Sequence, residues 1–224
     1  MTIQIRGGWS VLDYWKSGEC QVVLERLSDM RKKGEVFNPT RDRLFKALQF
    51  VPFAEVRIMF IGQDPYPDPM HATGIAFDVD ENIPLAKIPP TLKTIFKELN
   101  DDLHIQPKTG SLIPWCYEGV LLWNAIPSCP AFHSMGHDWP EWHLLTKEII
   151  QKLSHRGQTV FVFLGNVAKR FSGYVEPGEA FLELSHPSPR ASLRASRPFL
   201  GSRVFSECNR LLVEQGFEPI DWRL

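Results

Sequence analysis

The sequence predicts an α/β fold: a single domain in which a central, mainly parallel sheet of four to five strands has helices on both faces. Two observations predict it. Several apolar runs, rich in Val, Ile, Leu and Phe, are too short for amphipathic helices and are typical of strands buried on both faces. Segments with helical spacing separate these runs, and such alternation favours parallel strands. The expected strands are Val56–Gly62, Gly74–Val79, Val120–Asn124, Thr159–Gly165 and Ala180–His186.

The expected helices follow in chain order. Residues 1–50 form a helical N-terminal preface, because apolar residues recur at helical spacing through Val11–Leu27 and again near Leu44–Leu48. Ile88-Pro89-Pro90-Thr91 is typical of a helix entry, with Thr91 as N-cap or first-turn residue. The later expected helices are Leu92–Leu103, Glu141–Leu153, Val167–Phe171 and a last one near Arg203–Gln215.

Composition narrows the class of protein. The chain has 224 residues, of which 43% are hydrophobic, and this suits one compact domain spanning residues 1–224. Its 25 basic and 26 acidic residues exclude a polybasic nucleic-acid-binding coat but not local basic patches. Neither a signal-peptide pattern nor a membrane span is evident. Widely separated cysteines favour reduced thiols over disulfides or metal ligands, and hence a cytoplasmic protein, or a nuclear one if the source is eukaryotic or viral. These cysteines are Cys20, Cys116, Cys129 and Cys208.

Polar or sharply turning residues stand at the carboxyl ends of four of the expected strands. In open α/β sheets, ligands bind beyond the carboxyl ends of the strands. An acid, an amide, a tight turn and an imidazole are therefore expected to meet in one crevice. The segments concerned are Gln63-Asp64-Pro65-Tyr66, Asn124, Gly165-Asn166 and His186-Pro187-Ser188-Pro189.

Three of these motifs, in this order, resemble the uracil-DNA glycosylases of the first, most widespread family. Gly62-Gln63-Asp64-Pro65-Tyr66-Pro67 resembles the water-activating motif, Val120–Asn124 the uracil-reading strand, and His186-Pro187-Ser188-Pro189 the DNA-intercalating loop. The likeness runs from about Ile58 to Trp222. It implies a monofunctional base excision repair enzyme that hydrolyses the N-glycosidic bond of deoxyuridine in DNA. Such an enzyme releases free uracil by base flipping, leaves an abasic site, and needs neither a metal nor an organic cofactor.

The residue types suit this chemistry. Breaking the C–N bond leaves positive charge on the sugar and negative charge on the base, and the Asp64 carboxylate can orient a water and stabilise the cation. A neutral His186 can donate a hydrogen bond to the uracil oxygen as negative charge builds there. The Asn124 amide matches the N3–H and O4 edge of uracil, whereas cytosine presents the opposite pattern. Each residue also has a structural reading: turn capping for the acid, and a core hydrogen bond for the other two.

Three further pocket residues come from the resemblance. Phe77 matches the residue whose ring stacks on the extruded base, although a Phe in a strand is usually a core residue. Tyr66 matches the residue that crowds C5 of the base and so bars the thymine methyl group. Gln63 is expected to line the pocket through its backbone.

DNA-binding positions also come from the resemblance, because a base within a duplex must be flipped out to reach such a pocket. Thr91, Gly165, Asn166 and Ser188 match the positions that contact phosphates, although each could equally cap a helix or form a turn. An apolar wedge usually follows the His-Pro-Ser-Pro motif. Arg190 stands there in place of the usual Leu, which leaves two candidates open: Leu193 as the apolar wedge, or Arg190 as a stacking guanidinium.

The chain also departs from the family pattern at Pro67 and Thr73, where His is usual, and both changes remove a donor. The partner that the resemblance implies is uracil-containing single- or double-stranded DNA, with replication or repair proteins and a proteinaceous inhibitor left open. It implies no membrane, and a monomer suits a search along DNA.

Three other classes of function compete. One is a DNA-binding accessory factor, because some poxviral relatives of the family serve polymerase processivity. Retention of Asp64, Asn124 and His186 argues against a purely structural role but does not exclude a dual one. An iron–sulfur uracil glycosylase would need clustered cysteines, and these four are dispersed. An α/β hydrolase would need a G-x-S-x-G elbow, which the sequence lacks.

Overall fold

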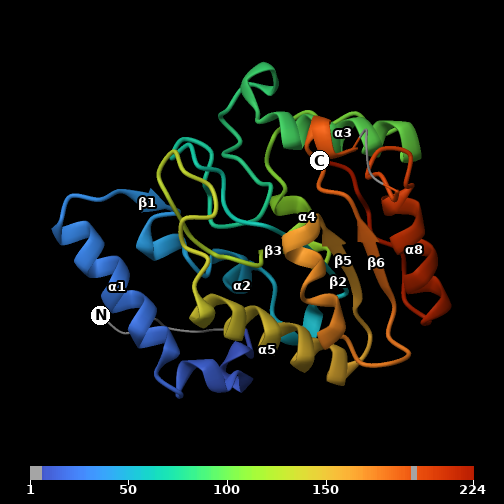
Figure 1. Cartoon of the computed structure of the whole chain (residues 1–224). Helices are drawn as coiled ribbons and strands as arrows, with labels where there is room; N and C mark the ends of the chain where they lie inside the picture. The colour runs from blue at the N-terminus through green and yellow to red at the C-terminus, as the bar shows by residue number, and fades with distance from the viewer. Residues whose placement is uncertain (1–6, 193–195) are drawn as a thin grey trace.

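The computed structural model describes residues 7–192 and 196–224, without the side chains of Arg190 and Ser192. Within these residues, a four-stranded sheet forms the centre of a mixed α/β domain, with helices on both faces (Figure 1). The strand order is β3-β2-β5-β6, and every neighbouring pair is parallel. The strands of this sheet are β2 (Ile58–Gly62), β3 (Val120–Asn124), β5 (Val160–Leu164) and β6 (Phe181–Leu184). A separate antiparallel pair consists of β1 (Phe37–Asn38) and β4 (Cys129–Pro130).

Eight helices surround the sheet within the described residues, and short 3₁₀ turns join several of them. Helix α5 covers one face, where the Trp123 indole of β3 donates to the Thr146 hydroxyl over 2.9 Å. On the other face the Phe60 ring of β2 packs against Phe205 of α8, with ring centroids 6.4 Å apart. The helices are α1 (Glu19–Lys32), α2 (Lys46–Phe50), α3 (Pro90–Leu103), α4 (Ile113–Tyr117), α5 (Pro140–Arg156), α6 (Asn166–Lys169), α7 (Pro189–Ser192) and α8 (Val204–Glu214).

The predicted parallel sheet is confirmed with four strands, but the prediction of a strand at Gly74–Val79 is wrong. This segment forms turns, because Gly74 (φ 89°) and Phe77 (φ 66°) both adopt the left-handed backbone conformation. It lies against β3 through a hydrogen bond from Ala76 N to Leu122 O of 3.1 Å. Its apolar residues are buried against the sheet without extending it, which is why a run of apolar residues imitated a strand.

The helix boundaries follow from local chemistry. Helix α3 begins at Pro90, since proline has no N–H to leave unpaired at a helix start. Thr91 therefore lies in its first turn. Helix α5 runs three residues beyond the predicted Leu153 and stops at Gly157, whose φ of 72° ends the α conformation.

The four cysteines are free thiols, and all but Cys20 are fully buried. Burial raises the pKa of the Cys116 and Cys129 thiols to about 12, so they remain protonated near neutral pH. Among the described helices, none combines the length and the apolar character needed to cross a membrane.

Candidate active site

The register of the sheet brings three polar residues and a glycine to one edge. Gly62 at the end of β2 pairs directly with Asn124 at the end of β3. Asp64 follows the end of β2 by two residues, and His186 follows the end of β6 by two. Because all four strands are parallel, these ends lie on the same side of the sheet. The structure thus places a carboxylate, an amide and an imidazole at one edge.

The Asp64 carboxylate accepts hydrogen bonds from three donors. Gln63 Nε2 donates to Oδ1 over 2.9 Å. The Ser134 hydroxyl lies 2.9 Å from Oδ1 and 2.7 Å from Oδ2, and the Met135 backbone N–H donates to Oδ2 over 2.6 Å. Gln63, expected to act through its backbone, therefore also contacts the acid through its side chain. Two of the three donors come from a distant loop that follows β4.

A backbone hydrogen bond and burial determine the tautomer and the protonation state of the His186 ring. The backbone N–H of Ser188 donates to its Nδ1 over 3.1 Å, so in the neutral ring the proton resides on Nε2. Burial lowers the pKa of His186, and the negative charge of Asp64 partly opposes that effect. The imidazole is therefore neutral at neutral pH and presents Nε2–H as a donor.

Gly62 forms the floor of the space between the aromatic and amide side chains. A methyl group added there would lie 2.7 Å from Phe77 Cζ and 2.9 Å from Asn124 Oδ1, so only glycine leaves room. The Phe77 carbonyl accepts a 3.0 Å hydrogen bond from the Tyr66 hydroxyl, which holds the left-handed turn at Phe77. The side-chain amide of Asn124 has no hydrogen-bond partner among the described residues.

At the same edge of the sheet, Gly165 follows β5 and is the N-cap residue of α6. Its φ of 90° is in the left-handed region, and an added Cβ would lie 2.9 Å from His186 Cβ. This glycine lets the His186 backbone approach β5 closely. Asn166 is the first residue of α6 and is exposed.

Thr91 and Ser188, two further predicted DNA-binding residues, belong to or adjoin the helices α3 and α7, which contact each other. Thr91 is half-buried in the first turn of α3, and α3 contacts α7. The half-buried Ser188 directly precedes α7, and its hydroxyl accepts a 3.4 Å hydrogen bond from Ala191 N. Arg190 belongs to α7, but its side chain is not described, and Leu193 lies outside the described residues.

Pro67 and Thr73, the two departures from the family pattern, both accept hydrogen bonds that hold the local backbone. The Pro67 carbonyl accepts hydrogen bonds from Asn38 Nδ2 (2.6 Å) and Phe132 N (2.8 Å). The buried Thr73 hydroxyl accepts from Ile75 N over 3.3 Å. Both positions therefore stabilise the loop after β2 without contributing an imidazole.

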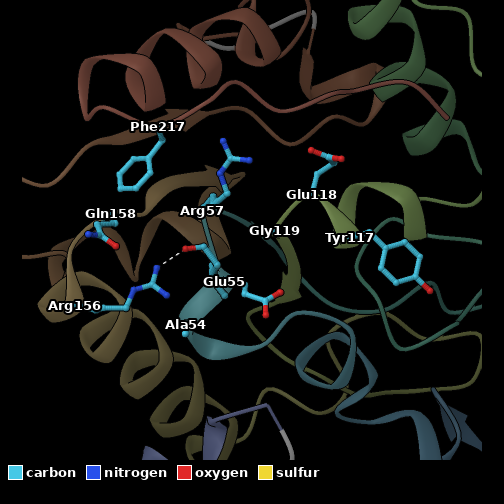
Figure 2. A pocket seen from close by; sticks show the side chains of 10 residues that line it. Ala54, Glu55, Arg57, Tyr117, Glu118, Gly119, Arg156, Gln158 and Phe217 are labelled. Carbon is cyan, nitrogen blue, oxygen red and sulfur yellow. Dashed lines mark hydrogen bonds between the residues drawn. The ribbon is translucent and has the colours of Figure 1, made fainter.

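An open pocket of about 330 Å³ lies elsewhere, at the amino ends of β2, β3 and β5 (Figure 2). None of the predicted site residues lines it. The guanidinium of Arg156 donates to the carbonyls of Phe53 and Val56 and, over 2.7 Å, to the Thr159 hydroxyl. These contacts hold the entry into the strands, so this charged side chain has a structural role.

Sequence reasoning missed two residues of the site. Ser134 lies in a stretch without apolar periodicity, and nothing near it in the sequence links it to Asp64. Gly62 was predicted at the end of a strand and at the start of a motif, but the space that it leaves between Phe77 and Asn124 depends on the fold. The glycine at a strand end was the one available signal.

Comparison with known proteins gives a consistent result. The family model described as the uracil DNA glycosylase superfamily matches residues 48–213. A uracil-DNA glycosylase of Ruegeria sp. (strain TM1040) is 36% identical over 217 residues, covering 96% of this chain and 88% of its own. One of Coxiella burnetii (strain CbuG_Q212) is 39% identical over 207 residues, covering 91% of this chain and 88% of its own. The crystal structure of the mimivirus uracil-DNA glycosylase superposes with a TM-score of 0.87 at 25% identity, over 100% of this chain and 90% of that one.

Proposed function

Because the chain belongs to the uracil DNA glycosylase superfamily and is a monofunctional DNA repair glycosylase that removes uracil from DNA, we propose that Asp64, Asn124 and His186 carry its reaction. We further assign it to the first family of these enzymes. The observation that carries the proposal is the meeting of these three side chains at the carboxyl edge of one parallel sheet.

The carboxylate and the imidazole act on opposite charges. Asp64 orients the attacking water and stabilises the positive charge that develops on the sugar. The Nε2–H of His186 donates to the uracil oxygen, and this hydrogen bond strengthens as the base becomes anionic. The Ser188 N–H on Nδ1 supports this assignment, since it fixes the tautomer that a donor requires.

The amide and the aromatic rings select the base. Asn124 pairs with N3–H and O4 of uracil, and because its amide has no partner among the described residues, both its acceptor and its donors are available. Phe77 stacks on the ring of the base, with its own ring centroid 6.4 Å from that of His186. Tyr66 crowds C5 and excludes thymine, and its hydroxyl bond to the Phe77 carbonyl keeps the two rings in fixed relation.

DNA is held around this pocket while the nucleotide is flipped out. Thr91, Gly165, Asn166 and Ser188 contact backbone phosphates, and either Arg190 or Leu193 fills the gap left in the duplex. Single- and double-stranded DNA both serve as substrate. A proteinaceous inhibitor that covers this edge of the sheet would compete with DNA.

The test is uracil release from single- and double-stranded oligonucleotides in the presence of EDTA. We expect release of free uracil from both, and we expect Asp64→Asn to lower kcat by about 10²–10⁴-fold while leaving DNA affinity nearly unchanged. Binding of DNA without release of uracil by the wild-type protein would favour the accessory-factor role. Full activity in Asp64→Asn would show that the carboxylate has been assigned wrongly.

A further inference from the structure

The loop of residues 131–137, which follows β4, lies over the catalytic carboxylate. Ser134 Oγ is within hydrogen-bond distance of both Asp64 oxygens, at 2.9 and 2.7 Å. The same hydroxyl accepts from Gln63 Nε2 over 3.2 Å. Ser134, Gln63 and Asp64 therefore form a closed triangle of hydrogen bonds, to which the Met135 N–H adds a further contact of 2.6 Å on Oδ2.

Two residues of this loop, one of which donates to Asp64, have a strained backbone conformation. Phe132 (φ 64°) and Met135 (φ 65°) both adopt the left-handed conformation, which is unfavourable for residues with a side chain. Such conformations persist where the surrounding structure enforces them, and they concentrate at functional sites. The hydrogen bond from Phe132 N to Pro67 O of 2.8 Å ties the loop to the catalytic motif. The left-handed turn at Met135 accompanies its N–H bond to the carboxylate.

The far end of the loop is anchored in the core. Gly136 allows the chain to pass Pro130, since an added Cβ would lie 2.5 Å from Pro130 Cγ. His137 is 1% exposed, is bonded to the Ser128 hydroxyl over 2.9 Å, and stacks on Trp139 with ring centroids 4.2 Å apart. The loop therefore approaches Asp64 from a fixed base.

From these contacts we propose that Ser134 is the positioning residue of the catalytic carboxylate. The proposal rests on the proposed role of Asp64. An ionised carboxylate has about four acceptor sites, and three donors fix its orientation while leaving capacity for one water. The hydroxyl thus determines which way the carboxylate faces, and with it the line along which the water approaches the sugar carbon. Preorganisation of this kind raises kcat without changing ground-state affinity for DNA.

The first experiment separates kcat from KM. We expect Ser134→Ala to lower kcat about 10-fold with KM unchanged, because the hydroxyl touches the acid and not the substrate. Ser134→Thr retains the hydroxyl and should restore most of the rate. Ser17→Ala is the matched control, since it removes a hydroxyl that bonds the Tyr14 carbonyl and the Glu19 side chain, far along the chain from Asp64. A higher KM at unchanged kcat would make Ser134 a DNA contact, and a higher kcat would make it an obstruction; either result would overturn the proposal.

The second experiment is a double-mutant cycle with Asp64→Asn, measured under single-turnover conditions with enzyme in excess. If Ser134 acts through the carboxylate, Ser134→Ala should cause no further loss in the Asp64→Asn background. Equal losses in both backgrounds would overturn the positioning role and leave the role of Asp64 intact. Full activity of Asp64→Asn alone would instead refute the proposed function, so the two failures are distinguishable.

Discussion

At the amino end of the central sheet, Arg57 and Arg156 line an open pocket of about 330 Å³ (Figure 2), whereas at the carboxyl end Asp64, Asn124 and His186 meet over the floor formed by Gly62. Judged by space and charge alone, the amino end is the more obvious binding site. When the two ends are compared by which polar side chains already have hydrogen-bond partners, the carboxyl end is the more obvious binding site.

The difference lies in which polar groups already have partners. Arg156 donates to two backbone carbonyls and a hydroxyl at the entry into β2 and β5, so its charge is used within the fold. Among the described residues, neither the Asn124 amide nor His186 Nε2 has a partner. Half-buried polar groups without partners cost free energy, and they are retained where a ligand completes them. Uncommitted donors and acceptors therefore favour the carboxyl end, where we propose that the reaction takes place, although the open pocket lies at the amino end.

The strongest test replaces one histidine at each end of the sheet. His186→Gln should lower kcat about 10²–10³-fold, because the flexible glutamine amide does not hold its N–H at the position where we propose that negative charge develops on the base. His155→Gln, an exposed residue near the amino end that contacts Glu176, should leave kcat unchanged. Steady-state kinetics on a single-stranded uracil oligonucleotide measure both. Comparable losses in the two variants would mean that the ends of the sheet are not functionally distinct.

The pH profile tests whether the carboxyl-end imidazole is neutral. Burial lowers the pKa of His186 below its ordinary value of 6.5, so the neutral ring, which accepts at Nδ1 and donates at Nε2, predominates above that pH. We expect kcat to stay flat as the pH falls from about 8 to 6.5 and to drop toward about 10-fold per unit only below the His186 pKa. The same depressed pKa makes the folded state bind fewer protons than the unfolded one, so stability also falls with acidification below 6.5. A rate that rises between about pH 8 and 6.5 would indicate a protonated imidazole instead.

Glycine substitutions sharpen the contrast between the ends. Gly62→Ala would place a methyl group 2.7 Å from Phe77 Cζ and should reduce kcat/KM about 10-fold by narrowing the uracil pocket. Gly119 at the amino end has a φ of 83°, and a Cβ added there would clash with the Glu55 carbonyl. Gly119→Ala should therefore lower the melting temperature without lowering kcat of the folded enzyme. Thermal denaturation and kinetics on both variants separate the two effects. Loss of stability alone in Gly62→Ala would remove the glycine from the site.

The sequence predicted the sheet well because its signals are local. Runs of Val, Ile, Leu and Phe gave four of the strands, and the residues just after them gave the catalytic candidates. The same reasoning failed at Gly74–Val79, where apolar side chains are buried by a turn with Phe77 in the left-handed conformation. It could not find Ser134, because a contact across 70 residues of sequence depends on how the loop after β4 folds back. Local patterns predict elements and strand ends, whereas contacts between loops require the tertiary structure.

The smallest expected effect on catalysis comes from the charged side chain of the amino-end pocket. Arg156→Gln should lower the free energy of unfolding by about 1–3 kcal/mol, because the carbonyls of Phe53 and Val56 lose their donor. Arg210→Gln, which removes exposed ion pairs with Glu207 and Glu214, should leave the free energy of unfolding almost unchanged, because solvent screens these pairs. Neither should alter kcat/KM of the folded enzyme, and urea denaturation together with kinetics on uracil-containing DNA checks both. If Arg156→Gln lowered kcat/KM while the folded fraction was unchanged, the amino end would take part in the reaction. In that case, hydrogen bonds from a charged side chain to the backbone would not show that its role in this fold is structural.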